Sequence, residues 1–223
     1  MKNYYAGKLN AGKLEQVYET KIPRVRQYLD AEIEFVARTL DGSEKILELG
    51  AGYGRIMKRL APFAESVTGI DISHDNVRFG KEYLRDAPNC RLLVMDAHGM
   101  EFDGEFHIVL CLQNGLSAIK GDPKNLVIRS VRALGPGGRA FFSTYSRRFW
   151  EHRLEWFQEQ SRKGLLGEID MEKTRDGRIV CKDGFTATTF APGDLEALGR
   201  SSGCPWRIEE VDASSLFLIL EKH

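Results

Sequence analysis

A short glycine-rich segment between an apolar strand and a helix constrains the fold of this chain most strongly. Residues 45–60 read KILELGAGYGRIMKRL, in which a strand pattern leads to glycines at positions 50, 52 and 54 and then to a helical pattern. Glycine has no Cβ atom, so such a turn lets the main chain come close to a ligand. The segment therefore predicts a β-strand, a ligand-contacting turn and an α-helix in that order.

Strand and helix patterns continue to alternate after this turn. Strands are predicted in SVTGIDIS, CRLLVMDA, FHIVLCLQN and RAFFSTYS, with LGPGG as a turn before the last of them. These strands are apolar on both faces, as a parallel sheet covered by helices on both sides requires. Ser73 and the pair Asp122-Pro123 are of the residue types that start helices, so they are predicted to begin the helices that follow the second and the fourth strand.

The pattern changes after Ser146. A charged and aromatic helix is predicted from Arg147 to Lys163, followed by the strand-like runs GEIDMEKT, RIVCK and FTATTF, which Asp-Gly turns separate. A helix opened by Pro192 and ended by Gly203 comes next, and RIEEVDA and SLFLILEKH then predict two antiparallel strands.

The N-terminal part is predicted to form a helical cap. Apolar residues three and four positions apart predict a helix over residues 22–40, which Asp41-Gly42 ends. Residues 1–21 are polar with scattered Tyr and Gly, so a mobile arm and a short helix both stay open. We expect one domain, divided into a cap (1–42), a core (43–146), an insertion after the fifth strand (147–190) and a C-terminal helix and hairpin (191–223).

The composition disfavours several classes of partner. Lys plus Arg equals Asp plus Glu, 32 each, which argues against a nucleic-acid binder because such proteins usually carry a basic face. No apolar run is long enough for a membrane span, and the N-terminus lacks the apolar core of a secretory signal. The four cysteines show no CxxC spacing, so we expect reduced thiols in a cytoplasmic protein without a metal site.

Three acidic residues stand at the ends of the first three predicted strands. Glu48 lies two residues before the first glycine, Asp71 follows that glycine by 21 positions, and Asp96 ends the third strand. The carboxyl ends of parallel strands with right-handed crossovers meet at one edge of the sheet, so we expect these carboxylates to line one crevice. An acid about 20 residues after the turn is placed to bind two ribose hydroxyls. The ligand is therefore expected to contain a nucleoside.

The chemistry of the turn separates two nucleoside ligands. A dinucleotide site has the spacing G-x-G-x-x-G and places a pyrophosphate at the helix N-terminus. This chain has G-x-G-x-G, with Arg55 after the last glycine and Glu48 before the first. A carboxylate at Glu48 repels a pyrophosphate and attracts an ammonium or a sulfonium. The charges favour S-adenosylmethionine over NAD.

In order and spacing, five segments of the chain resemble the successive motifs of the class I S-adenosylmethionine-dependent methyltransferases. They are ILELGAGYGRIMKRL, VTGIDIS, LLVMDAHGMEF, FHIVLCLQNGLSAI and LGPGGRAFFS, over about residues 45–146. The resemblance implies a doubly wound, Rossmann-like α/β fold with a seven-stranded, mostly parallel sheet and a C-terminal antiparallel hairpin. It also implies an enzyme of the small-molecule type that takes S-adenosylmethionine as co-substrate and releases S-adenosylhomocysteine.

The resemblance further implies which residues bind the donor. Carried over by position, they are Glu48, Gly50, Ala51 and Gly52 at the methionine part, Asp71 at the ribose, Ile72, Asp96 and Ala97 at the adenine, and Leu112 and Gln113 beside the sulfonium. One position departs from the family, which often has Asp where this chain has His107, at the start of the fourth strand. This histidine lies at the wrong end of its strand for catalysis, so we expect it to bind nearby backbone.

No catalytic base stands out, and the acceptor is not specified by any motif. Gln113 and Asn114 follow the fourth strand and Tyr145 ends the fifth, so these three are candidates for orienting the acceptor. Because no basic tail or nucleic-acid-binding appendage is present in the sequence, we expect a small soluble acceptor and no nucleic-acid or membrane partner.

Two aromatic segments flank the predicted core. In similar enzymes the N-terminal cap folds over the donor, and here that cap holds Tyr4, Tyr5, Tyr18 and Arg24. Aromatic residues of the insertion are more often part of a core than of a substrate-binding box, and both interpretations stay open for Phe149, Trp150, Trp156 and Phe157.

Two further functions compete with methyl transfer. The lack of an evident base is compatible with a non-catalytic module that binds S-adenosylmethionine or S-adenosylhomocysteine. An NAD-dependent oxidoreductase is the weaker alternative, because Glu48 precedes the glycine turn.

Overall fold

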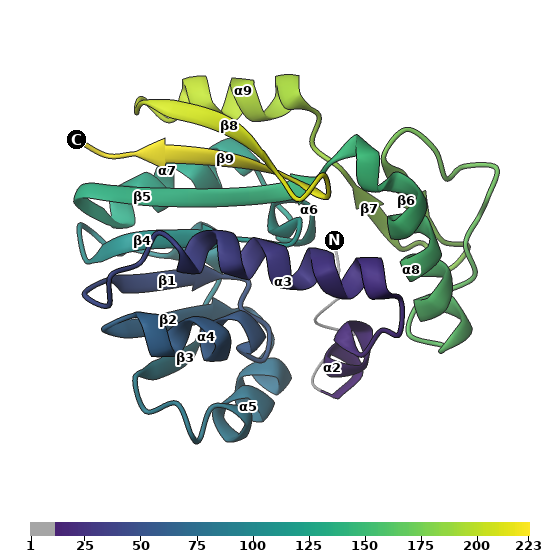
Figure 1. The fold of residues 1–223 in the computed structure, drawn as a ribbon, viewed down its shortest axis with the longest axis horizontal. Coiled ribbons are helices and arrows are strands. Elements are labelled where there is room, and N and C mark those ends of the chain that lie inside the picture. The colour runs from purple at the N-terminus through teal and green to yellow at the C-terminus, as the bar shows by residue number, and fades with distance from the viewer. Residues whose placement is uncertain (1–11) are drawn as a thin grey trace.

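A seven-stranded sheet forms the centre of the protein (Figure 1), which a computed structural model describes over residues 12–223. Tyr4 and Tyr5 lie outside these residues. The strand order is β3-β2-β1-β4-β5-β9-β8. The strands span Lys45–Leu49 (β1), Ser66–Asp71 (β2), Cys90–Val94 (β3), Phe106–Cys111 (β4), Leu134–Tyr145 (β5), Trp206–Val211 (β8) and Ser215–Glu221 (β9).

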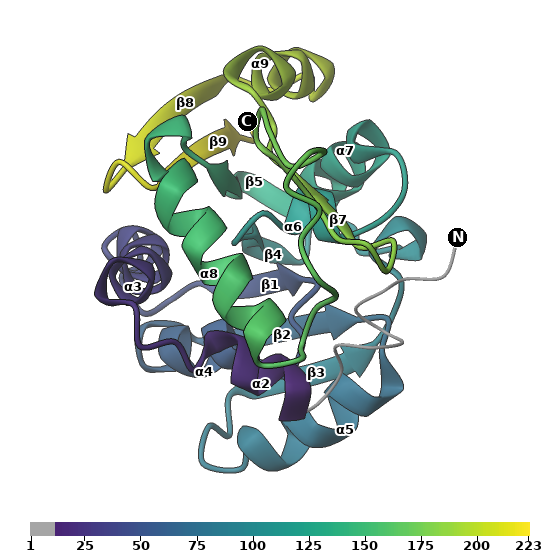
Figure 2. The same cartoon turned by 90° about the vertical axis from the view of Figure 1, so that its right-hand side faces the viewer.

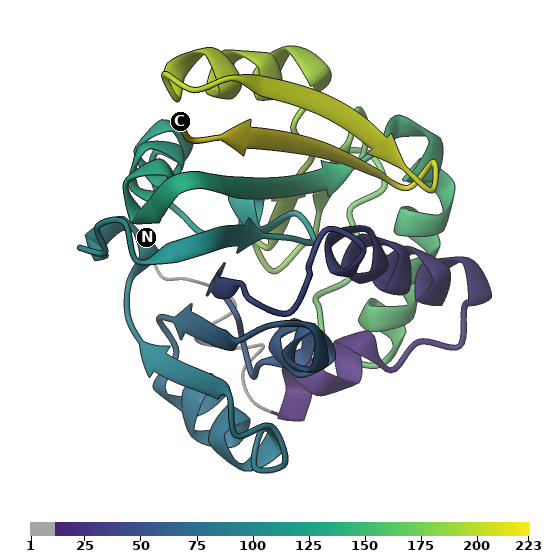
Figure 3. The same ribbon diagram turned by 60° about the vertical axis from the view of Figure 1, so that its left-hand side comes forward.

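The first five strands are parallel and the last two form the expected reversed hairpin. β9 pairs antiparallel with β5, in register from Arg139 opposite Glu221 to Tyr145 opposite Ser215, and β8 pairs antiparallel with β9. Figure 3 shows this hairpin beside β5 at one edge of the sheet. The doubly wound α/β fold class and the C-terminal hairpin that the sequence predicts are confirmed.

Helices cover both faces of the sheet. One face carries α3 (Pro23–Ala37), α4 (Arg55–Leu60) and α5 (His74–Tyr83), and the other carries α6 (Gly115–Ala118), α7 (Pro123–Ala133) and α9 (Pro192–Ser201). Neighbouring strand residues alternate between the two cores: Ile108 packs into the first and Val109 into the second. This alternation explains why the strands are apolar on both faces. Short 3₁₀ turns span Ala61–Phe63, Ala97–Gly99 and Arg147–Phe149.

A third apolar cluster joins the N-terminal segment to the insertion after β5. It packs α2 (Gly12–Tyr18) and α3 against α8 (Trp150–Arg162) and the hairpin of β6 (Arg178–Val180) and β7 (Thr186–Thr188). The indole N–H of Trp156 donates to the carbonyl of Val17 at 3.1 Å. Figure 2 shows α8 crossing in front of the sheet with α2 beside it. The two segments therefore form one layer over the carboxyl ends of the strands. From here on, the cap means this layer of α2, α8 and the β6–β7 hairpin, and no longer residues 1–42 alone.

Several predicted helix starts are observed with the bonds that explain them. The hydroxyl of Ser73 accepts from the backbone N–H of Asn76, and the carboxylate of Asp122 accepts from that of Lys124. These caps satisfy N–H groups that a helix start leaves without an intrahelical partner. Pro192 stands at the start of α9, as predicted.

Three boundaries differ from the sequence prediction. The segment LGPGG is part of β5, and the pairing with β4 shifts register between Phe106 and Ile108, so the expected turn is an irregular strand start. The run GEIDMEKT forms a single bridge, between Ile169 and Cys181, instead of a strand. The first long helix ends at Ala37, three residues before the predicted end.

The side chain of His107 has the structural role that its position predicts. Its Nδ1 accepts a hydrogen bond from the backbone N–H of Lys45 at 3.0 Å, on the strand beside it. The four cysteines are free thiols. Within the described part of the chain, none of the helices has the length and apolar character that a membrane crossing needs.

Candidate functional site

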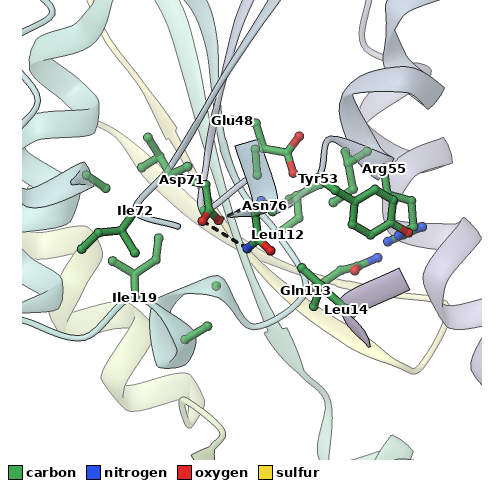
Figure 4. Close-up of a pocket in the computed structure, with 18 of the residues that line it drawn as sticks. Leu14, Glu48, Tyr53, Arg55, Asp71, Ile72, Asn76, Leu112, Gln113 and Ile119 are labelled. Carbon is green, nitrogen blue, oxygen red and sulfur yellow. Dashed lines mark hydrogen bonds between the residues drawn. The ribbon is translucent and has the colours of Figure 1, made fainter. Parts of the chain in front are cut away.

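A pocket of about 280 Å³ lies where the ends of the parallel strands meet the cap. Side chains of α2 and α8 line it together with the segments that follow β1, β2, β3 and β4, and Figure 4 shows several of them pointing inward. The structure brings the following sequence-predicted residues to its walls: Tyr18, Glu48, Gly50, Ala51, Gly52, Asp71, Ile72, Asp96, Ala97, Leu112, Gln113 and Tyr145.

The glycine turn forms the floor of the pocket with bare backbone. Gly50 and Gly52 have φ of 66° and 57°, in the left-handed region that favours glycine. A Cβ atom on Gly52 would lie 2.9 Å from a methyl group of Leu14 on α2. The cap therefore packs directly against the turn, and a side chain at residue 52 would displace Leu14 and strain the left-handed backbone.

The carboxylate of Asp71 holds the turn and the next helix in place. Its Oδ2 accepts a hydrogen bond from the backbone N–H of Gly52 at 2.9 Å. Its Oδ1 accepts two, from the backbone N–H of Ser73 at 2.8 Å and from the side-chain amide of Asn76 at 3.2 Å (Figure 4). Burial raises the pKa of Asp71, and these three hydrogen bonds oppose that effect. A carboxylate oxygen accepts more than one hydrogen bond, so Asp71 retains capacity for a ligand hydroxyl.

An acid, Glu48, and a base, Arg55, each present buried polar atoms at the pocket wall that have no hydrogen-bond partner among residues 12–223. Glu48 is 4% exposed, its Oε2 accepts no hydrogen bond, and burial raises its pKa to about 8, against the opposing charge of Arg55. The guanidinium of Arg55 lies 4.4 Å from the ring centre of Tyr18, and its buried Nε and Nη2 have no hydrogen-bond partner. Buried polar atoms of this kind are usually satisfied, so the pair indicates a ligand with both charges.

The loop after β4 has a strained backbone that a buried carboxyl group holds. Gln113 and Asn114 have φ of 53° and 62°, which residues with side chains rarely adopt. The backbone N–H of Gln113 donates to Glu32 Oε2 at 2.8 Å and to the hydroxyl of Ser143 at 2.7 Å. This geometry points the side chain of Gln113 to the pocket, where its buried Nε2 has no hydrogen-bond partner.

Two sequence candidates lie away from the pocket. The side-chain amide of Asn114 donates to the carbonyl of Thr188 at 2.9 Å and accepts the hydroxyl of Thr144 at 2.8 Å, so Asn114 fastens β7 to the core. Arg24 donates to the carboxylate and the carbonyl of Asp212, each at 2.6 Å, and does not line the pocket. Long-range pairing directs both side chains to other parts of the fold.

Glu32 and Gln160 are residues at or behind the pocket wall that the sequence patterns do not indicate. Arg55 is indicated only by its place beside the glycine turn. Glu32 is fully buried on α3, and Gln160, on α8, is 3% exposed and lines the pocket. The one available signal was a charged residue on the apolar side of a predicted helix, which Glu32 provides between Leu29 and Ile33.

Aromatic residues of the insertion form part of the apolar core of the cap, and some of them also line the pocket. Phe149, Trp156 and Phe157 are at most 5% exposed and belong to the third apolar cluster, and Trp156 and Phe157 also line the pocket. The two interpretations of these residues are therefore compatible. Within residues 12–223, no three His, Cys, Asp or Glu side chains gather as a metal-binding cluster.

Comparison with known proteins identifies a matching family model and several curated relatives. Residues 46–138 match the family model described as a methyltransferase domain. A curated relative, the ubiquinone biosynthesis O-methyltransferase of Hydrogenovibrio crunogenus, is 25% identical over 196 residues, which are 86% of this chain and 70% of that protein. Other proteins of that name align over 45% to 56% of their own length.

Solved structures share the fold at lower identity. The PH0226 protein from Pyrococcus horikoshii is 19% identical with a TM-score of 0.67, and each chain is covered completely. The 1,6-didemethyltoxoflavin-N1-methyltransferase of Burkholderia thailandensis, solved with 1,6-didemethyltoxoflavin and S-adenosylhomocysteine, is 15% identical with a TM-score of 0.62. The alignment covers 94% of this chain and 86% of that one.

Proposed function

Because this chain belongs to the class I S-adenosylmethionine-dependent methyltransferases, we propose that its pocket binds the donor and a small acceptor together and transfers the methyl group between them. The observation that carries the proposal is that Oε2 of the acid Glu48 and Nε and Nη2 of Arg55, all buried beside the glycine turn, have no hydrogen-bond partner among residues 12–223. Relatives that are named O-methyltransferases support an acceptor of low molecular weight.

The amino-acid end of the donor fits between Glu48 and Arg55. An α-ammonium group would satisfy the unpaired Oε2 of Glu48, and an α-carboxylate would accept from the buried guanidinium of Arg55. Hydrogen bonds between charged groups are worth about 1.5–3 kcal/mol each. NAD has no such end, and its pyrophosphate would approach the carboxylate of Glu48.

The nucleoside end fits the acids of the next two strands. Asp71 retains acceptor capacity for ribose hydroxyls and already fixes the turn through Gly52. Ile72, 49% exposed, offers an apolar face for a base. Asp96 lines the pocket with Ala97, and among residues 12–223 its carboxylate accepts one hydrogen bond, from the backbone N–H of His98. These features support adenosine recognition.

The protein contributes to the reaction mainly by alignment and exclusion of water. S-adenosylmethionine supplies a methyl group that its sulfonium already activates. Leu112 and Gln113 hold the wall at the end of β4, and Tyr18, Trp156 and Phe157 cover it from the cap. Holding two reactants in line in a closed site lowers a barrier by about 7–11 kcal/mol, so methyl transfer needs no strong base in this pocket.

Calorimetry with S-adenosylmethionine, S-adenosylhomocysteine and NAD tests the donor site, and radiolabelled methyl transfer to a metabolite extract tests catalysis. We expect both sulfur nucleosides to bind, NAD not to bind, and label to appear in a small molecule. Tight donor binding without transfer to any extract would instead indicate a non-catalytic binding module. Binding of NAD in place of the sulfur nucleosides would contradict the proposal.

A further inference from the structure

The pocket lining is divided by charge into two ends. Its charged side chains gather around the glycine turn and the ends of β2 and β3, and they are Glu48, Arg55, Asp71 and Asp96. Lys120 also lines the pocket. The neighbouring side chain of Ile119 lies 3.2 Å from the place that a Cβ atom on Gly50 would take. A second group of lining residues, from the segment after β4, the end of β5 and α8, consists of Gln113, Tyr145, Trp156, Phe157 and Gln160. Arg55 borders this group, because its guanidinium lies over the ring of Tyr18, which is 6.5 Å from the ring of Trp156.

We call this second group the aromatic end, and its walls are rigid. The ring of Trp156 is fixed by its bond to the carbonyl of Val17 and lies 6.0 Å from the ring of Phe157 at 77°. The ring of Tyr145 lies 5.4 Å from that of Tyr28. Aromatic faces held in this way bind flat apolar rings by dispersion and offset stacking.

A hydrogen-bond donor is buried within these walls. The Nε2 atom of Gln113 has no hydrogen-bond partner in the part of the chain that the structure describes, although Glu32 and Ser143 bind the left-handed backbone of this residue. Leaving a buried amide without a partner costs about 1–3 kcal/mol, which a ligand oxygen recovers. The acceptor therefore presents a hydrogen-bond acceptor atom beside Gln113.

A cation lies behind one aromatic ring of this group. The guanidinium of Arg153 lies 4.3 Å from the ring centre of Tyr145 and is itself held by the carbonyls of Gly177 and Ala187. Burial raises the pKa of Tyr145 to about 12, so its hydroxyl stays protonated and able to donate. Within residues 12–223, the lining side chains of this group include no carboxylate, and the nearby carboxyl group of Glu32 accepts the backbone N–H of Gln113.

We propose that the aromatic end binds a planar ring compound with an acidic hydroxyl, a phenol or an enol, and that this oxygen is the methyl acceptor. The inference rests on the proposed function and specifies its substrate class. The hydroxyl releases its proton to water, and Gln113 Nε2 holds the resulting oxyanion. An oxygen lone pair then forms the new C–O bond while the C–S bond of the donor breaks, and its electron pair stays on sulfur as a neutral thioether.

The first test identifies the atom that is methylated. The full chain is incubated with labelled S-adenosylmethionine and a metabolite extract, and the labelled product is characterised by mass spectrometry and NMR. We expect the methyl group on an oxygen attached to an unsaturated ring. Label on nitrogen, sulfur, carbon or an aliphatic hydroxyl would overturn this inference and leave the proposed function in place. Donor binding without incorporation would contradict both.

The second test measures binding without turnover. The protein saturated with S-adenosylhomocysteine is titrated with 4-nitrophenol, whose phenolate absorbs at longer wavelength than the phenol. We expect binding to raise the phenolate fraction, Gln113→Ala to weaken binding at least tenfold, and Gln113→Asn, which keeps the carboxamide, to weaken it less than threefold. Both variants are titrated at saturating S-adenosylhomocysteine, with saturation checked by calorimetry, so that a change in donor affinity is measured separately from the effect on 4-nitrophenol. Tighter binding of cyclohexylmethylamine than of 4-nitrophenol, or equal effects of the two variants, would overturn the inference.

Discussion

The carboxyl group of Glu32 accepts a hydrogen bond from the backbone N–H of Gln113 over 2.8 Å, across 81 positions of sequence. The same group accepts the hydroxyls of Ser143 at 2.8 Å and Ser215 at 2.5 Å. One fully buried side chain of α3 therefore ties the helix to the end of β4, to β5 and to β9. The left-handed conformation of Gln113 depends on this anchor.

Removal of this anchor is expected to cost stability. Glu32→Ala leaves three buried donors without their carboxyl partner, so we expect a loss of about 2–4 kcal/mol in the free energy of unfolding. Glu32→Gln keeps one carbonyl oxygen and should lose less than half of that. Chemical denaturation measures both values. Glu34→Gln, at an exposed position of the same helix, is the control and should change stability by less than about 0.5 kcal/mol. Equal values for Glu32→Ala and Glu34→Gln would refute the anchoring role.

Two buried acids make stability depend on pH in a definite direction. Burial raises the pKa of Glu32 to about 7 and that of Glu48 to about 8, from 4.5 in the unfolded chain. Between pH 4.5 and these raised pKa values the folded state holds more protons than the unfolded state, so the stability that these two groups contribute is fully present below about pH 4.5. It falls as pH rises to about 8, by up to about 1.4 kcal/mol per unit for each group.

Urea denaturation between pH 5 and pH 8 measures this slope. Glu48→Gln removes one of the two groups and should make the profile flatter, whereas substitution of an exposed acid such as Glu196 should leave it unchanged. A stability that rises over the same interval in the wild type would show that neither acid is protonated in the folded state.

Asp71 is expected to contribute strongly to donor affinity. Asp71→Ala removes the acceptor of ribose hydroxyls and frees the backbone N–H of Gly52, so binding of S-adenosylhomocysteine should weaken by about 2–4 kcal/mol. Calorimetry measures the change, and Asp75→Ala, in the first turn of α5 where Asp75 pairs with Arg78, serves as the control. Unchanged affinity in Asp71→Ala would mean that the ribose is held elsewhere.

Donor binding is expected to release protons near neutral pH. Glu48 is largely protonated below pH 8 without ligand, and an ammonium group beside its carboxylate favours the ionised form. The observed binding enthalpy should therefore differ between buffers of different ionisation enthalpy, and affinity should increase from pH 6 to pH 8. Glu48→Gln should abolish the buffer dependence. Equal enthalpies in all buffers for the wild type would exclude this linkage.

The sequence predicts the features that arise from local patterns. Apolar periodicity and turn glycines identify the alternating strands and helices, and the ends of parallel strands bring Glu48 and Asp71 to one pocket. Long-range partners decide the rest. Asn114 appears in sequence to face the acceptor, but bonds to Thr188, 74 positions away, turn it toward β7. Glu32 is unremarkable in sequence because its three partners come from β4, β5 and β9 once the sheet has formed.

The recognition of the amino-acid end by Glu48 and Arg55 is the central claim, and one comparison of ligands tests it directly. S-adenosylhomocysteine and 5′-methylthioadenosine share the thioether and the nucleoside, but only the first has an ammonium and a carboxylate. Calorimetry with both ligands is carried out on the wild type and on Arg55→Leu. We expect the substitution to weaken S-adenosylhomocysteine by about 10- to 150-fold, as the loss of a charged hydrogen bond implies, and to change 5′-methylthioadenosine less than twofold. An equal effect on both ligands, or no effect on S-adenosylhomocysteine, would contradict the account.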